Sequence, residues 1–245
     1  MKPARSIDRA TDILLEFIEH PTMNATDLHQ NLRIPKPTLY RMLSGLEEKG
    51  LIHSFGDPRQ YRLGPQILKL SEAWSNSIDL GVVSEPILAS LNARTNETIV
   101  LFVPYGMNQR IAARQFRSSQ ALSYHLPPGD ISPFTIGAAG KVMLAFFPEK
   151  KGARIWTQVK SEAARAALLS TLKQIRKNGY CVTNGDRAAG GCSVSAPILS
   201  QDGIALGSIA LLMPESRLDL KTKALYVKLI VGAGREISRL AGRSH

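Results

Sequence analysis

The order of short helical and strand patterns at the N-terminal end restricts the fold more than any other feature of the sequence. Ser6 can cap a first helix, in which apolar residues recur at spacings of three and four. This stripe consists of Ile7, Ala10, Ile13, Leu14, Phe17 and Ile18. A polar turn around Asn24 leads into a second short helix through Leu28 and Leu32. Such spacing predicts that each helix packs one face against a common core.

A third helix and a hairpin follow directly. The segment from Pro37 to Lys49 is predicted to be helical, because proline suits a first helical turn and Gly50 suits a stop. Two strand-like segments, residues 51–55 and 60–63, are joined by Gly-Asp-Pro-Arg, whose composition favours a turn. The order helix, helix, helix, hairpin is typical of a winged helix-turn-helix domain, whose second motif helix lies in the major groove of DNA.

Positive charge is concentrated outside this N-terminal region. The chain carries a net charge of +11, yet residues 1–64 contain nine basic and eight acidic side chains. Net charge therefore cannot identify the DNA-binding part, and only a local pattern can. The segment from Arg33 to Arg41 contains three basic residues and no acidic one. It is the locally basic part of the predicted DNA-binding domain.

The side chains expected to contact DNA lie around the start of the third helix and in the hairpin. They can donate hydrogen bonds to base edges or phosphates, and the hairpin can reach the flanking backbone or minor groove. The predicted contacts are Arg33, Lys36, Thr38, Tyr40, Arg41, Arg59 and Arg62. A plainer interpretation stays open, in which Lys36 and Arg41 are ordinary solvated charges and the hairpin is a scaffold.

The length of 245 residues exceeds the roughly 100–150-residue mode of single domains, which favours two domains. We expect a DNA-binding domain over residues 1–64, a linker helix over 65–79 and a second domain over 80–245. The linker carries an apolar stripe of Ile67, Leu68, Leu70 and Trp74. A bare connector would leave this stripe in water, so we expect at least a dimer.

Helical and strand patterns alternate through the second domain. Strand patterns cover residues 97–103, 109–116, 180–183, 193–199 and 203–213, and helical patterns cover residues 82–93, 137–147, 162–178 and 221–240. Strands interleaved with helices indicate an α/β or α+β domain. Together with the helical N-terminal domain, this places the chain in the α+β class.

Several short motifs resemble enzyme signatures but have the wrong spacing. Gly-Ala-Ala-Gly-Lys at 137–141 lacks the P-loop spacing, Gly-Cys-Ser-Val-Ser at 191–195 is not a nucleophile elbow, and Gly-Ala-Gly at 232–234 lacks the third dinucleotide glycine. The five histidines form no His-Glu-x-x-His pair, and Cys181 and Cys192 form no Cys-x-x-Cys pair. We therefore expect no catalytic residue, no metal site, no disulfide and no cofactor.

No part of the sequence suggests a membrane segment. The longest nearly unbroken apolar stretch, residues 204–213, is far shorter than the ~20 residues that span a bilayer. The first ten residues lack an apolar signal core, and the composition of 44% apolar and 21% charged residues is typical of globular proteins. We expect a cytoplasmic protein without a membrane partner.

The motifs in order resemble those of IclR-family transcriptional regulators over nearly the whole chain. They are SIDRATDILLEFI, TDLHQNLRIPKPTLYRMLSGLEEKGLI, YRLGPQILKL, GAAGKVMLAFFP, IRKNGYCV, SVSAPI and MPESRL. The resemblance implies a winged helix-turn-helix, a linker helix and a C-terminal α/β effector-binding domain of GAF-like fold. It also implies a double-stranded DNA operator, a small effector such as an organic acid, and a homodimer or a dimer of dimers.

The resemblance places an effector pocket in the second domain. The implied pocket residues are Ile136, Gly137, Ala138, Thr183, Ser193, Ala210 and Leu212. The free amides at a helix start favour an anion, so we expect a ligand carboxylate to face Gly137 and Ala138. The alternative is that these small residues only permit close packing. Similar proteins often carry an Asp, a Cys and two Ser at the last four positions, and their replacement here favours an apolar or aromatic carboxylate.

Two classes of function remain in competition. One is a ligand-responsive regulator of catabolic genes, acting by repression or activation, and the other is an α/β enzyme or small-molecule carrier with an accessory helical domain. A regulator predicts salt-dependent, sequence-specific binding of a DNA duplex, whereas an enzyme or carrier predicts only weak and sequence-indifferent binding.

Overall fold

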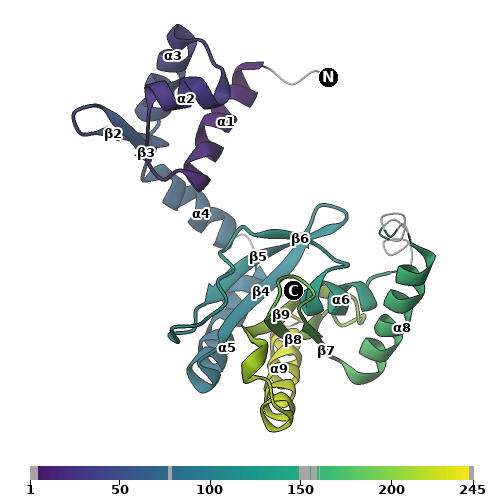
Figure 1. Ribbon diagram of the computed structural model, residues 1–245. Helices are drawn as coiled ribbons and strands as arrows, with labels where there is room; N and C mark the ends of the chain where they lie inside the picture. The colour runs from purple at the N-terminus through teal and green to yellow at the C-terminus, as the bar shows by residue number, and fades with distance from the viewer. Residues whose placement is uncertain (1–4, 77–78, 149–154, 156–158, 160, 243–245) are drawn as a thin grey trace. The chain divides into compact units, whose positions relative to one another are not determined.

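The computed structural model describes residues 5–76, 79–148, 155, 159 and 161–242. The chain divides into two compact units, residues 1–77 and 78–245, called here the N-terminal and C-terminal units (Figure 1). Residues 77–78 of the predicted linker lie outside the described residues. Among the described helices, none combines the length and the apolar character that crossing a membrane requires.

The N-terminal unit contains the predicted three helices and hairpin, followed by a fourth helix. The elements are α1 (Arg5–Glu19), β1 (Met23–Asn24), α2 (Ala25–Leu32), α3 (Lys36–Glu48), β2 (Ile52–Phe55), β3 (Gln60–Leu63) and α4 (Gln66–Asn76). The strands form an antiparallel sheet in the order β1, β3, β2. The winged helix-turn-helix architecture is therefore confirmed, and the sequence did not predict the two-residue β1.

Local signals explain most of these boundaries. The Asn24 side chain caps α2 by accepting hydrogen bonds from the amides of Thr26 and Asp27, at 2.8 and 2.9 Å. Gly50 adopts a φ of +68° just after α3, as expected for a helix stop. The Ser6 cap was wrong, because α1 already includes Arg5 and Ser6 therefore lies inside the helix.

The core of the N-terminal unit uses only part of the predicted α1 stripe. Ile13 and Phe17 are buried against α2, α3 and the sheet, whereas Ile7 and Ile18 are 67% and 66% exposed. The predicted apolar stripe is therefore wider than the part of α1 that packs against the rest of the unit. Ile7 and Ile18 of this stripe remain exposed on the surface.

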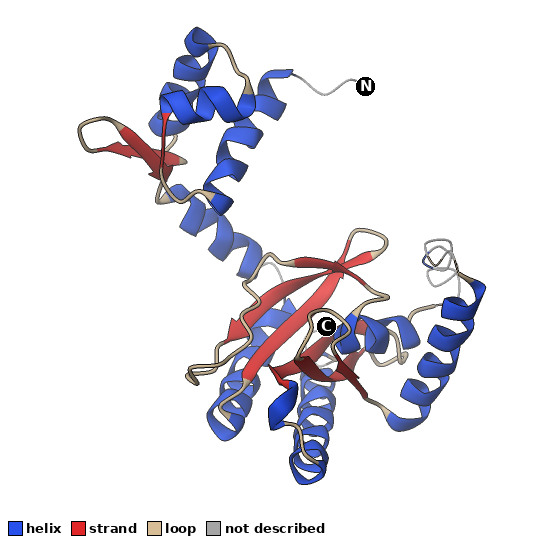
Figure 2. Cartoon of the chain, in the orientation of Figure 1, coloured by secondary structure: helices blue, strands red, loops and turns tan. Residues whose placement is uncertain are grey.

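The C-terminal unit is a six-stranded antiparallel sheet with helices on both faces (Figure 2). The strand order is β6, β5, β4, β9, β8, β7. The strands are β4 (Thr98–Tyr105), β5 (Gln109–Phe116), β6 (Ile131–Pro133), β7 (Cys181–Asn184), β8 (Gly191–Leu199) and β9 (Ala205–Pro214). The longer helices are α5 (Asp79–Thr95), α6 (Gly137–Ala145), α8 (Glu162–Asn178) and α9 (Leu220–Ala241). An antiparallel sheet within a mixed chain confirms the α+β class.

Two apolar cores lie on opposite faces of this sheet. Along β4, Ile99 and Leu101 pack with α5 and α9, whereas Val100 and Phe102 pack with α6 and α8. This alternation follows from the two-residue period of a strand. The second core borders the site described next, because α6 begins where the sheet and its loops leave a cavity.

Candidate DNA interface and effector site

Helix α3, the predicted recognition helix, has buried apolar residues on one side and exposed polar residues on the other. Leu39, Leu43 and Leu46 are buried, whereas Lys36, Tyr40 and Arg41 are exposed and Thr38 is half-buried. Arg33 is also exposed and ends α2 in the left-handed region, with φ of 52°, at the turn into α3. The predicted DNA contacts of the turn and helix therefore lie on the surface of the N-terminal unit.

The two arginines of the β2–β3 hairpin, the wing of this domain, have different surroundings. Arg59 Nη2 lies 2.8 Å from Glu47 Oε2 of α3, and Glu47 also accepts hydrogen bonds from the amide and hydroxyl of Ser54. These Ser54 bonds are the largest cause of a lowered Glu47 pKa, and Arg59 adds to them. Arg62 instead places its guanidinium carbon 4.8 Å from the centroid of the Phe55 ring. Arg59 thus ties the wing to α3, while Arg62 has no ion pair in the described part of the chain.

A cavity of about 240 Å³ opens in the C-terminal unit beside the start of α6. Its wall comes from β4, β5, the loop after β5, the first turn of α6, strands β7 and β8 with the turn between them, and β9. This volume is below the roughly 300–1,000 Å³ of pockets for drug-sized ligands. The cavity therefore fits a small molecule.

The structure brings five of the seven predicted effector residues together at this cavity. They are Gly137, Ala138, Thr183, Ser193 and Leu212. Ile136 and Ala210 are not part of the wall: Ile136 precedes α6 with 37% exposure, and Ala210 is fully buried in the core. Ala210 and Leu212 are two residues apart on β9 and therefore face the same side of the sheet. Only Leu212 reaches the cavity, because the two residues differ in their position along the strand.

The amides at the start of α6 are already hydrogen-bonded within the protein. The Gly137 amide donates to Asp186 Oδ2 at 2.7 Å, and the Ala138 amide donates to Thr183 Oγ1 at 3.2 Å. Lys141 Nζ lies 2.7 Å from the same Asp186 oxygen. A carboxylate of the chain itself thus occupies the position expected for a ligand carboxylate, and a ligand would have to displace it.

The cavity wall is more charged than the sequence suggested. Arg187 Nη2 lies 2.7 Å from both carboxylate oxygens of Asp130, and its Nη1 donates to Ser132 Oγ at 2.6 Å. Asp130, Asp186 and Arg187 all line the cavity. No local pattern in the sequence predicts this group, because Asp130 lies more than 50 residues before Asp186 and Arg187, and only the fold brings their charges together.

Arg110 of β5 is the most deeply buried charge at the cavity, with 2% exposure. Burial is the main reason that its pKa is lowered to about 10, and neighbouring Arg187 lowers it further. The guanidinium therefore stays protonated at neutral pH. Its Nη1 donates to the carbonyl oxygen of Pro133, and its carbon lies 5.1 Å from the Phe102 ring centroid. The position of Arg110 directly before the apolar residues 111–113 of a predicted strand was the available sequence signal.

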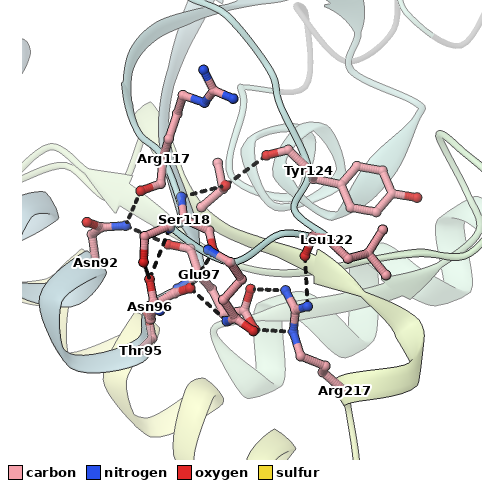
Figure 3. A network of polar contacts seen from close by, with 12 residues as sticks. Asn92, Thr95, Asn96, Glu97, Arg117, Ser118, Leu122, Tyr124 and Arg217 are labelled. Carbon is pink, nitrogen blue, oxygen red and sulfur yellow. Dashed lines mark hydrogen bonds and ion pairs between the residues drawn. The ribbon is translucent and has the colours of Figure 1, made fainter.

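A buried polar network fixes the loop that forms one side of the cavity (Figure 3). Glu97, 1% exposed, accepts two hydrogen bonds from Arg217 at 2.7 and 2.6 Å, and Arg217 Nη1 donates to the Leu122 carbonyl at 2.8 Å. Thr98 Oγ1 donates to the Tyr124 carbonyl at 2.7 Å. The Glu97 hydrogen bond is the largest cause of a raised Arg217 pKa.

The Tyr124 side chain connects this loop with the turn between β7 and β8. Its hydroxyl donates to the Ala189 carbonyl at 3.1 Å, and its ring lies where a Cβ at position 191 would stand. Gly191 is thus required for the ring to reach its position. The loop residues Tyr124, His125 and Leu126 all line the cavity.

The cysteines of the chain are poor nucleophiles. Burial raises the pKa of both Cys181 and Cys192 to about 11, so each thiol is protonated at neutral pH. Both are free, and Cys192 borders the cavity. Among the described residues, no cluster of three or more His, Cys, Asp or Glu side chains could hold a metal ion.

Comparison with known families decides what this arrangement belongs to. The family model for the IclR helix-turn-helix domain matches residues 6–54, and that for the C-terminal domain of the bacterial transcriptional regulator IclR matches residues 73–239. The chain belongs to the IclR family of bacterial transcriptional regulators. It is a DNA-binding transcriptional regulator, and the enzyme alternative is not supported.

Relatives and solved structures of this IclR-family chain cover nearly its whole length. The transcriptional regulator BhcR of Paracoccus denitrificans is 26% identical over 241 residues, covering 96% of this chain and 86% of the relative. The crystal structure of the Thermotoga maritima IclR has a TM-score of 0.85 at 22% identity, covering 97% of this chain and 98% of that one. A Microbacterium hydrocarbonoxydans homologue, solved with 4-hydroxybenzoate, has a TM-score of 0.80 at 18% identity, covering 98% and 100%.

Proposed function

We propose that the cavity of the C-terminal unit binds a small aromatic carboxylate and that this binding changes the affinity of the regulator for its DNA operator. The observation that carries the proposal is the cavity wall itself, which combines apolar surface from Phe102, Leu126 and Leu212 with a buried arginine. An aromatic acid presents the same two features, an apolar ring and a negative charge. The solved homologue with 4-hydroxybenzoate supports the same ligand class.

The operator would be contacted by the exposed residues of the N-terminal unit. In this proposal, Lys36, Tyr40 and Arg41 enter the major groove, with Thr38 beside them, and Arg33 supports the same edge. Arg62 reaches the flanking backbone more freely than Arg59, because Arg59 is paired with Glu47. The proposed functional division stays at residues 1–64 for DNA binding, 65–79 for the linker and 80–245 for the effector domain.

A homodimer or a dimer of dimers would present two such surfaces to a pseudo-palindromic operator. Its support comes from apolar side chains on the surface of the single chain. On α4, Leu68 and Leu70 are 73% and 59% exposed, and on α1, Ile7 and Ile18 are similarly exposed. A second copy of the chain would remove them from water. Sedimentation of the full chain at micromolar concentration tests this, and a stable monomer near 26.8 kDa would contradict it.

The proposed function is tested by a duplex-binding titration at one fixed salt concentration. The probe is DNA from the control region beside the gene, with a scrambled duplex as control and a panel of aromatic and short-chain carboxylates as ligands. We expect specific binding that an aromatic acid changes and that glyoxylate or pyruvate changes less. Equal affinity for both duplexes, or a response to the short acids alone, would contradict the proposal.

A further inference from the structure

The charges around the effector cavity leave one cation without an anion. Asp130 pairs with Arg187, and Asp186 pairs with Lys141, each at 2.7 Å. Arg110 has no carboxylate oxygen within 4.0 Å among the described residues. Among the described residues, the cavity wall and the adjacent Lys141 together carry three cations and two anions, which leaves one positive charge that the protein itself does not balance.

The hydrogen bonds of Arg110 are also incomplete. Its guanidinium donates to the Pro133 carbonyl, but its buried Nε has no hydrogen-bond partner. Buried charges in proteins are normally paired and fully hydrogen-bonded, because desolvation disfavours them otherwise. A cation that is 2% exposed and lacks an ion pair needs a reason beyond the stability of the fold.

Two glycines of α6 make room for this guanidinium. A Cβ at Gly140 would collide with Arg110 Nη1 and with the Phe134 carbonyl, and a Cβ at Gly137 would lie 3.3 Å from Arg110 Nη2. The Gly-Ala-Ala-Gly sequence thus allows the arginine to lie against the first turn of the helix. The Gly137 and Ala138 amides of the same turn already donate to Asp186 and Thr183, so a ligand would reach them only by displacing these side chains.

We propose that Arg110 is the residue that binds the carboxylate of the effector, and that its single unbalanced charge selects a monoanionic acid. This inference rests on the proposed function of the cavity. The ligand carboxylate pairs with the Arg110 guanidinium at the buried end. The ring then lies along Leu126 and Leu212, within reach of polar groups such as the Ser193 hydroxyl. A second carboxylate on the ligand would meet Asp130 and Asp186 and be repelled.

The test compares an acid with its uncharged analogue in the full-length protein. Calorimetry measures the binding of 4-hydroxybenzoate and 4-hydroxybenzamide to wild type, to Arg110→Met and to Arg110→Lys. The expected preference of wild type for the acid is about 10- to 100-fold. Arg110→Met should lose that preference by weakening the acid and leaving the amide within about threefold. Arg110→Lys keeps the positive charge but loses the planar guanidinium that can donate two parallel hydrogen bonds to a carboxylate, so it should keep part of the preference.

The matched control is Arg114→Met on the same strand. Arg114 Nη1 lies 3.5 Å from Glu85 Oε2 of α5, and Arg114 is not part of the cavity wall. This variant should bind the acid as wild type does. Terephthalate, with two carboxylates, should bind wild type more weakly than 4-hydroxybenzoate.

The outcomes separate the inference from the function on which it rests. Binding of the acid and the amide with equal affinity to wild type would overturn the role of Arg110 and leave the cavity as an aromatic-ligand site. The same holds if Arg110→Met and Arg114→Met weaken the acid equally. If wild type binds neither compound nor any other aromatic acid of the panel, the proposed effector class fails and the inference fails with it. The comparison within wild type decides the matter even if Arg110→Met does not fold.

Discussion

The N-terminal unit keeps its charges on the surface, whereas the C-terminal unit buries two charged side chains. The proposed DNA contacts Lys36, Arg41 and Arg62 are all exposed. Every buried polar or charged side chain in the described part of the chain belongs to the C-terminal unit, including Glu97 and Arg110. Exposed positive charges attract a polyanion such as DNA over some distance, and salt screens this attraction. Buried charges are screened much less and act at short range on a small ligand. The difference matches two tasks within one regulator.

We expect the largest loss of stability when the buried Glu97–Arg217 ion pair is removed. Arg217→Met should lower the free energy of unfolding by about 3 kcal/mol, because it leaves the Glu97 carboxylate buried without its counter-ion. Chemical denaturation followed by circular dichroism measures this loss. The loop that carries Tyr124 should become more protease-sensitive, because Arg217 also holds the Leu122 carbonyl.

The matched exposed pair is Arg59–Glu47 of the N-terminal unit. The Arg59 side chain is 60% exposed, so Arg59→Met should cost less than about 1 kcal/mol in the same experiment. Equal losses in the two variants would show that burial does not distinguish the charges of the two units.

The next effect concerns DNA binding by the recognition helix. Lys36→Ala and Arg41→Ala should each weaken operator binding by about 1–3 kcal/mol if the side chain contacts a base, with a uniform loss across sequences if it contacts phosphate. Fluorescence anisotropy at fixed salt measures the affinity. Lys228→Ala, which removes an exposed charge from α9, is the control. Unchanged affinity in both α3 variants would remove α3 from the interface.

The smallest effect concerns the apolar side of the cavity. Leu212→Ser should weaken an aromatic acid by about 1 kcal/mol, because it replaces apolar contact with a hydroxyl. The operator affinity of the ligand-free protein should stay the same, because the cavity influences DNA binding only through the ligand. Calorimetry and anisotropy on the same preparation measure both. Stronger binding of the acid to the variant would show that Leu212 faces no part of the ring.

Local sequence patterns predicted the elements well and the cavity only in part. Pro37 lies in the first turn of α3 and Gly50 follows its end, and β5 and α8 begin and end at the predicted residues, because these signals depend on neighbours in the chain. Arg110, Asp186 and Arg187 come together only in the folded unit, so no local pattern predicts that they line one cavity. The exposure of Ile7 and Ile18 was also not predictable, because helical spacing alone does not say how much of the α1 stripe the rest of the unit covers.

We propose that one ligand-biased equilibrium links the cavity to the DNA-binding surface. A reciprocal titration tests this link: operator affinity is measured with and without a saturating aromatic acid, and acid affinity with and without operator. Linkage requires the two ratios to be equal, and we expect a factor of about 5–150 that Arg110→Met removes. A ratio of one for an acid that binds wild type tightly would contradict the claim, because the occupied cavity would then leave DNA binding unchanged.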